Sequence, residues 1–556
     1  MDKRTIWAIV ISLAFLFAWN MFFNKKKAPE VIPAQTNAVQ SSAGSPAVRP
    51  AGAAGAVLDA RSEVLTKNFG YVTVDFDHRG GGVRNIWLRN FLQVSNRRVN
   101  LADGVDAADF AALPFSIYLT PARELGKVFF DAASGKDSVT FTYRTRGTEG
   151  LPAGIVVTKT FSADTNSYVI KIETSLKNAS GREIDLENAG IDTFSIDFFD
   201  TPAPVKKNNQ YNQTVLSFCQ NGKMKKVSSG PKIAGKYRDM GLSTDYEWVS
   251  LANRYFVVSL IAFDRQALKR PVFGVDDSTY SIAFNQKTRE VLRKDQEMKF
   301  VYYAYTGPKD RDIFREYKKR FSDAYGLVSF EQAMGFSPII GPISNLLLDA
   351  LDFFRKFLPS YGWAILLLTL LIKLVFLPLS YKQYESMGKM KDLQPHLTAL
   401  KEQYKNDPQR LNQETMAIYK KYKINPLGGC LPMLIQIPVF FAFYDLLSKS
   451  IQLRGSAFYW IKDLANPDTV AWISTFPINI LPILMAGSMF VQQLLSTGDP
   501  QQKKIMAFMP LIFLFIFWNL PSGLTLYWTC QNILSIGEQL LINSRLKSKK
   551  KAQAAT

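Results

Sequence analysis

Residues 369–381 read TLLIKLVFLPLSY, and they place a lysine inside an apolar segment. The apolar run extends from Tyr361 to Leu379, which is long enough for a helix to cross a bilayer. A charge at such a depth costs roughly 2.5–3.5 kcal/mol on insertion scales, so charged residues there usually face water, a partner or a substrate path. Lys373 therefore indicates a membrane protein and is its first candidate functional residue.

The charge of the chain is strongly basic and unevenly distributed. Its 556 residues include 67 lysines and arginines against 47 acidic residues, a formal net charge of +20. Such a charge is typical of nucleic-acid binding unless the basic residues lie in the loops of a membrane protein. The three cysteines form no CxxC pair, so neither a disulfide framework nor a zinc site is expected. We expect no metal and no cofactor.

Six apolar runs are candidate membrane spans. The first, residues 5–23, is followed by NKKK rather than by a cleavage site, so we interpret residues 1–27 as an uncleaved anchor. The other five lie within a core at 360–545, at about 361–380, 427–449, 477–496, 505–520 and 522–542. The expected fold class is a polytopic α-helical membrane protein with six spans.

Four polar segments accompany these spans. Residues 28–56 are rich in Ala, Pro, Ser and Gly, which is typical of a flexible linker. Residues 57–335 contain many short alternating segments separated by turn residues, which predicts a large antiparallel β-sandwich domain. Residues 336–359 predict an amphipathic helix that lies flat in the membrane interface, with a domain-capping helix as the alternative. Residues 382–425 predict an antiparallel helical hairpin around the NDP turn at 406–408.

Basic residues in the loops predict the orientation of the spans. The hairpin carries nine lysines and arginines and the tail at 546–556 is also basic, whereas the connection at 450–476 has two. The hairpin and both termini are therefore expected on the cytoplasmic side and the β domain outside. Lys25–Lys27 oppose this orientation, but the summed bias of the other loops outweighs them. The charge mainly indicates topology, with RNA contact as a second interpretation.

Two acidic residues inside the spans could pair with Lys373. Asp445 is expected near the outer end of its span and Glu538 near the inner end, whereas Lys373 is expected slightly inside the midplane. No dedicated buried ion pair is therefore expected, although the lysine could snorkel towards Glu538. The ammonium most simply faces a water-containing cavity open to the cytoplasm. Neutral polar residues within spans commonly only join helices, at about 0.6 kcal/mol each.

Three motifs together resemble the YidC/Oxa/Alb family of membrane protein insertases. They are NPLGGCLPMLIQIPVFFAFY (425–444), QQKKIMAFMPLIF (501–513) and LPSGLTLYWTCQN (520–532). The resemblance covers about 340–545 specifically, and the linker and β domain match the long form found in Gram-negative-type bacteria. It implies the bacterial inner membrane, a periplasmic β domain and a hydrophilic intramembrane groove open to the cytoplasm. It implies nascent membrane proteins, the Sec translocon, the ribosome and lipids as partners, and no small-molecule substrate.

The resemblance also assigns residues to the groove. Lys373 stands where many relatives have arginine, which keeps the charge but loses the bidentate fork. Tyr527 and Trp528 fall where relatives contact the nascent span, and Thr369 lies one helical turn before Lys373. With the intramembrane polar residues, the candidate groove set is Lys373, Thr369, Gln436, Tyr527, Trp528 and Asn532. The candidate ribosome or RNA contacts are Arg545, Lys547, Lys549, Lys550 and Lys551.

The expected function is insertion and folding of nascent membrane proteins, alone or with the Sec translocon. No enzymatic activity is expected, and the chain contains no GxxxxGK[ST] phosphate-binding motif. A secondary transporter is one alternative, but it predicts repeated halves and several intramembrane charges. A second alternative makes the β domain a relative of sugar mutarotases. Such a site needs a histidine and a carboxylate, and this domain has only His78, beside a glycine-rich turn.

Overall fold

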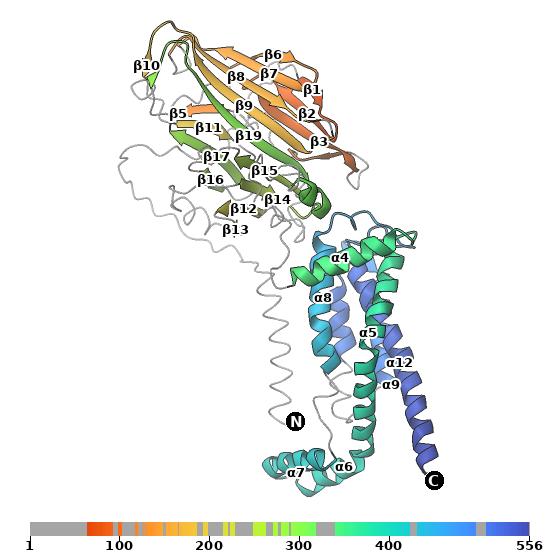
Figure 1. Cartoon of the computed structure of the whole chain (residues 1–556). Helices are drawn as coiled ribbons and strands as arrows, with labels where there is room; N and C mark the ends of the chain where they lie inside the picture. The colour runs from red at the N-terminus through yellow and green to blue at the C-terminus, as the bar shows by residue number, and fades with distance from the viewer. Residues whose placement is uncertain are drawn as a thin grey trace.

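The computed structural model describes a β domain and a helical part below it (Figure 1). It describes residues 64–554 except for several short gaps and longer ones at 103–116, 198–214, 228–247, 263–270, 318–339, 423–430 and 496–507. The predicted anchor at 1–27 and the linker at 28–56 lie outside the described residues.

The described strands form four antiparallel sheets in the β domain. One sheet of nine strands has the order β13 (Lys223–Val227), β12 (Val215–Gln220), β14 (Trp248–Ala252), β15 (Phe256–Ala262), β19 (Glu297–Pro308), β9 (Val169–Asn178), β8 (Ile155–Ser162), β7 (Ser138–Arg144) and β6 (Asp131–Ser134). A second has the order β1 (Val64–Asn68), β2 (Val72–Asp77), β3 (Gly82–Leu92) and β4 (Arg98–Asn100). A third has the order β16 (Pro271–Val275), β17 (Tyr280–Lys287), β11 (Thr193–Asp197) and β5 (Ile117–Thr120), and β10 (Ile184–Asp185) pairs with β18 (Val291–Leu292).

The core of the β domain lies between the first two of these sheets. Alternate residues of β8 are buried, as the period of two in a strand requires. The ring of Phe76 on β2 lies 4.7 Å from that of Phe161 on β8 and 5.7 Å from that of Phe141 on β7, measured between centroids. The prediction of a β-rich domain with antiparallel strands is therefore confirmed.

The helical part begins with α4 (Gly341–Arg355), which lies across the upper ends of the longer helices (Figure 1). Those below it are α5 (Tyr361–Asp392), α8 (Leu431–Lys449), α9 (Ile480–Leu495), α11 (Met509–Phe517) and α12 (Ser522–Ala554). Among the described residues, one helix, Tyr361–Met390, is long and apolar enough to cross a membrane, and Ile480–Leu495 is a shorter apolar helix. The count of six spans stays a prediction.

Three boundaries differ from those expected. Helix α5 continues to Asp392, so the first residues of the expected hairpin segment extend this helix. Two shorter helices follow, α6 (Gln394–Gln403) and α7 (Pro408–Lys421), and the Asp407 carboxylate between them accepts from the Arg410 N–H at 3.0 Å. Residues 477–479, expected to start a span, belong to β21 (Phe476–Asn479), which pairs with β20 (Thr469–Ile473). Helix α12 includes most of the tail.

Arg254, in the turn between β14 and β15, joins the β domain to the helical part. Its guanidinium donates to the Ser448 carbonyl at 2.7 Å, the Ala465 carbonyl at 2.6 Å, the Leu447 carbonyl at 3.2 Å and the Asn466 side-chain oxygen at 3.3 Å. Ala465 and Ile451, from the connection after α8, are buried in the same apolar cluster as the β-domain core. The β domain is therefore docked on the end of α8 and on the connection that follows it.

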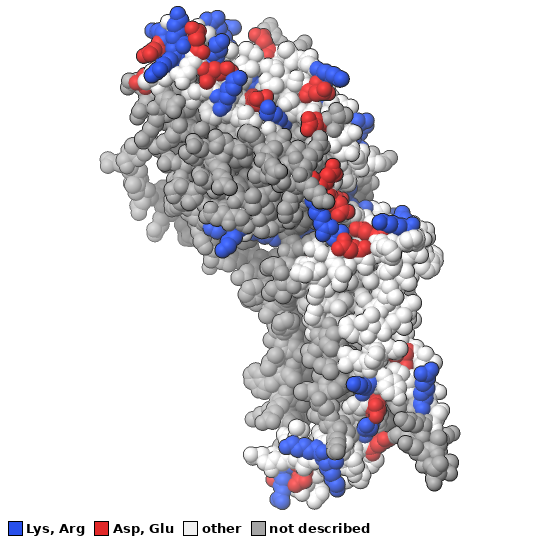
Figure 2. All heavy atoms as spheres, viewed as in Figure 1, with Lys and Arg blue, Asp and Glu red and all other residues white. Residues whose placement is uncertain are grey.

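Charged side chains gather at both ends of the helical part and are sparse between them (Figure 2). On the visible face, the described residues around α4 and the docked β domain show clustered acidic and basic atoms, and so does the region of α6 and α7. Many large apolar side chains on the intervening helices are exposed, among them Val375, Leu494, Phe515 and Leu541. A water-soluble protein rarely exposes a patch this large, so lipid contact accounts for it.

Candidate functional site

Lys373 faces helix α12 and forms an ion pair. Its ammonium lies 3.0 Å from a carboxylate oxygen of Glu538 and donates to the Ser535 hydroxyl at 2.7 Å. Only 13% of the lysine side chain and 7% of the glutamate side chain are exposed. The expectation that Lys373 forms no dedicated buried ion pair is therefore wrong, and its partner is Glu538, the residue towards which snorkelling was the alternative. Lys373 is 12 residues from the start of α5 and Glu538 is 16 residues from the start of α12, so they differ in depth by about 6 Å, which the four-carbon stem of a lysine can span.

The ion pair is held mainly through Ser535. The Ser535 hydroxyl donates to the Gln531 carbonyl at 2.8 Å, and the Tyr384 hydroxyl donates to the Ser535 carbonyl at 3.3 Å. The second carboxylate oxygen of Glu538 is buried and has no hydrogen bond within the described structure. The lysine is thus fixed by one neutral and one charged partner, while the carboxylate is only half satisfied.

Tyr527 and Trp528 lie in aromatic packing rather than beside Lys373. Tyr527 is fully buried and stacks on Phe443 of α8, with centroids 4.3 Å apart and planes inclined by 17°. Trp528 packs against Phe440 of α8 at 5.2 Å and against Phe513 of α11 at 5.8 Å. The Trp528 indole N–H is a further buried group without a hydrogen bond in the described region.

Three buried oxygens that have no hydrogen-bond partner among the described residues follow one face of α12. They belong to Tyr527, Gln531 and Glu538, at helical positions i, i+4 and i+11. The Gln436 side chain of α8 lies close to the Tyr527 hydroxyl. Most buried polar groups in proteins are hydrogen-bonded. Three unpaired oxygens on one helix face therefore indicate a place where a ligand or client could supply hydrogen bonds. We call Tyr527, Gln531, Ser535 and Glu538 the α12 polar row.

Of the remaining candidate residues of the spans, Thr369 bonds within its own helix and Asn532 bonds to a neighbouring helix. The Thr369 hydroxyl is buried and donates to the Ile365 carbonyl of its own helix at 2.6 Å. The Asn532 amide donates to the Ser488 hydroxyl of α9 at 3.2 Å, and the Gln539 amide donates to the Leu495 carbonyl at 2.9 Å. Helix α12 is therefore bonded to α9 as well as to α5.

The basic tail continues helix α12 to Ala554. Arg545 is exposed. The side chains of Lys547, Lys549, Lys550 and Lys551 lie outside the described part, so their role as ribosome contacts stays a prediction.

Sequence reasoning did not include Gln531, Ser535, Glu538 or Tyr384 in the candidate site. The signal for the first three was their spacing of four, eight and eleven residues from Tyr527, which places all of them on its helix face. Tyr384 had no comparable signal, because its segment was interpreted as the start of the hairpin.

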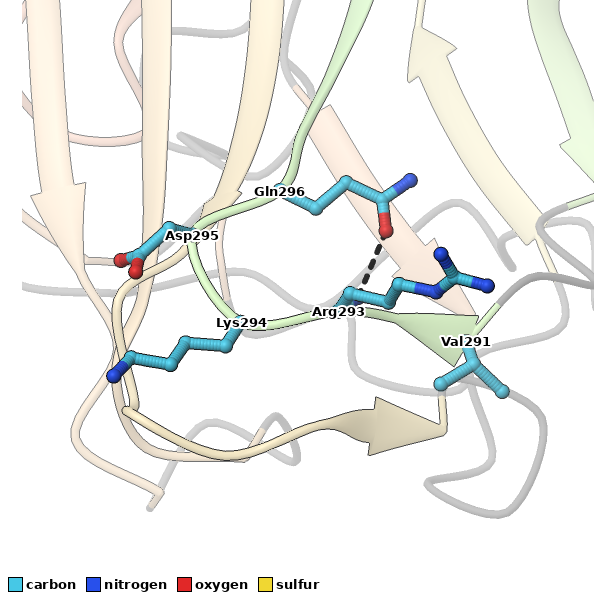
Figure 3. Close-up of a pocket in the computed structure, with 5 residues that line it drawn as sticks. All are labelled: Val291, Arg293, Lys294, Asp295 and Gln296. Atoms are coloured by element: carbon cyan, nitrogen blue, oxygen red, sulfur yellow. Dashed lines mark hydrogen bonds between the residues drawn. The ribbon is translucent and has the colours of Figure 1, made fainter.

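A hollow on the β domain has a different character (Figure 3). It is lined by Val291 of β18 and by Arg293, Lys294, Asp295 and Gln296 of the turn between β18 and β19. The Gln296 side-chain oxygen accepts from the Arg293 N–H at 2.8 Å and closes this turn. Because the lining residues are nearly consecutive, the hollow is a feature of one exposed turn and gives no support to an enzymatic site.

Comparison with known proteins identifies relatives along almost the whole chain. The family described as "60Kd inner membrane protein" matches residues 353–550, and the family described as "YidC periplasmic domain" matches residues 68–331. The membrane protein insertase YidC of Pelobacter propionicus is 33% identical and covers 98% of this chain and 99% of its own length. That of Syntrophus aciditrophicus is 34% identical, with 98% and 100% covered. A solved structure of an active YidC insertase covers 97% of this chain and 99% of its own, with 16% identity and a TM-score of 0.37.

Proposed function

Because the chain belongs to the YidC family of membrane protein insertases, we propose that it inserts nascent membrane proteins through a hydrophilic groove between α5, α8 and α12 that opens to the cytoplasm. The observation that carries the groove is the α12 polar row beside Lys373. An orphaned buried polar group costs about 1–3 kcal/mol, so a client that supplies hydrogen bonds to the row is favoured.

The proposed mechanism needs neither ATP nor a covalent step. A client must move a short polar tail across hydrocarbon while its apolar segment enters lipid. Polar groups along α12 shorten the dry distance that the tail crosses, and Lys373 holds its acidic groups. Burial of the apolar segment in lipid, at about 25 cal/mol per Å², then drives release of the client. Exposed apolar side chains such as Val375 and Ile437 offer the segment a path into lipid.

The proposed topology places the β domain in the periplasm and both termini in the cytoplasm. It is supported by the basic residues of the hairpin and tail, because positive loops stay on the cytoplasmic side. The α6–α7 hairpin and the end of α12 lie at the end of the molecule opposite the β domain (Figure 1). Cooperation with the Sec translocon and contact of the tail with the ribosome belong to the same proposal, as does membership of the groove for Thr369, Gln436, Trp528 and Asn532.

The test replaces Lys373 and follows clients that differ in tail charge. After depletion of the endogenous insertase, Lys373→Arg is expected to support insertion, Lys373→Ala to lose acidic-tailed clients, and Lys373→Glu to be worst because it repels them. Insertion is measured by protease protection of one acidic-tailed and one neutral-tailed client. Lys389→Ala is the matched control, since Lys389 is exposed on the same helix and pairs only with Glu385 in the described structure. Wild-type insertion of the acidic-tailed client by Lys373→Ala would refute the role of the charge.

A further inference from the structure

The Lys373 ammonium already has a carboxylate partner, so an acidic client group must displace that carboxylate before it can bind the lysine. Glu538 occupies the position beside the ammonium that an acidic client group would need. We propose that Glu538 is an internal competitor of the client: its carboxylate closes the lysine site and is displaced by an acidic group of the incoming tail. This inference rests on the insertase function proposed above and deepens it by adding a residue that sets client specificity.

The Glu538 carboxylate has few contacts, so it can be displaced from Lys373. One carboxylate oxygen binds Lys373, and the other is buried without a hydrogen bond in the described region. Within the described residues, the ion pair itself is therefore the one polar contact that holds the carboxylate in place. By contrast, Asn532 and Gln539 on the same helix are each bonded to α9, so α12 itself remains attached when the Glu538 side chain rotates away.

Lys373 keeps a partner when Glu538 leaves. The Ser535 hydroxyl accepts from the ammonium at 2.7 Å and is itself oriented by its bond to the Gln531 carbonyl. The cation therefore stays at the same place on the groove wall during the exchange. A buried cation is strongly unfavourable without a counter-charge, so the state between the two partners is brief.

Exchange of one carboxylate for another selects by charge. An acidic client group replaces what Glu538 supplied, whereas a neutral polar group leaves the lysine without a counter-charge. The pair thus stays closed to neutral tails and opens to acidic ones. An unpaired groove lysine would attract acidic tails more strongly, because no internal carboxylate competes with them, and would also attract anions from the cytoplasm.

The experiment measures capture of stalled nascent chains by a photo-crosslinking residue at Leu370 or Leu377. Both positions are exposed and lie about one helical turn from Lys373. Glu538→Gln is expected to raise the crosslinking of an acidic-tailed client about tenfold and to leave a neutral-tailed client unchanged, because the competitor has been removed. Glu385→Gln is the matched control, since Glu385 is an acid on α5 that pairs with Lys389.

A second variant distinguishes the loss of the competitor from misfolding. Glu538→Asp keeps the charge but withdraws it by one methylene, so it is expected to change capture in the same direction and to a smaller extent. Unchanged or reduced capture of the acidic-tailed client by both variants, with wild-type thermal midpoints, would overturn the competitor role. If Lys373→Ala still abolishes capture in that case, the proposed function stands without the competitor. If Lys373→Ala has no effect, the groove mechanism itself fails.

Discussion

Replacing Arg254 by alanine tests how strongly the β domain is docked on the helical part. Arg254 is 8% exposed and donates to three carbonyls and one side-chain oxygen from residues 447–466. A hydrogen bond to a charged group contributes about 1.5–3 kcal/mol. Counting only the two shortest, to Ser448 and Ala465, Arg254→Ala is expected to weaken docking by about 3–6 kcal/mol. Water that enters the vacated space lowers the loss towards the smaller figure.

The assay follows the distance between the β domain and the helical part in reconstituted protein. Spin labels at Val291 and Tyr459, both exposed, report the distribution of that distance by pulsed electron resonance. Arg254→Ala is expected to broaden the distribution, Arg254→Lys to give an intermediate width because lysine lacks the fork, and Arg182→Ala on an exposed turn to leave it unchanged. An unchanged distribution in Arg254→Ala, with both parts folded, would refute the assignment of docking to this side chain.

Three further predictions concern single groups. Burial, with the nearby Lys449 and Lys226, lowers the pKa of Lys309 from 10.5 to about 7, so the folded protein binds fewer protons than the unfolded chain between these values. Stability is therefore expected to rise with pH across that window by up to about 1.4 kcal/mol per unit, and Lys309→Met should flatten thermal midpoints measured against pH. Tyr527→Phe removes a buried hydroxyl without a described hydrogen bond, so the thermal midpoint should hold or rise while insertion falls; lowered stability with normal insertion would contradict this. Neutralising Lys547, Lys549, Lys550 and Lys551 should weaken ribosome co-sedimentation and its dependence on salt, and an unchanged salt series would leave these lysines a topological role only.

The sequence predicted the local features of the fold well because each depends on neighbouring residues. Alternation gave the strands of the β domain, and apolar runs gave the approximate positions of α5, α8 and α9. The ends of helices were predicted less well. A polar sequence after residue 380 was interpreted as a new element, but polar residues continue a helix readily once it leaves the lipid, so α5 extends to Asp392.

Contacts between distant segments escaped prediction for a different reason. Lys373 and Glu538 are separated by 165 residues, and their pairing depends on how α5 and α12 pack against each other. The docking of Arg254 likewise joins segments about 200 residues apart. No periodicity in one segment encodes such a meeting. The unusual residue types, a lysine and a glutamate within apolar runs, identified both residues as candidates but did not predict that they pair.

The Arg254 contacts also set an order of events during synthesis. Every acceptor of its guanidinium lies 193–212 residues later in the chain, and Ile451 and Ala465 of the same buried cluster are equally late. At about 5–20 residues per second, the ribosome needs roughly 10–40 s after Arg254 to produce them. The strands of the β domain are complete by Pro308, long before that. During this interval the acceptors of the Arg254 guanidinium have not yet been synthesised. The β domain can therefore dock on the helical part only late, after α8 and the connection that follows it have been made.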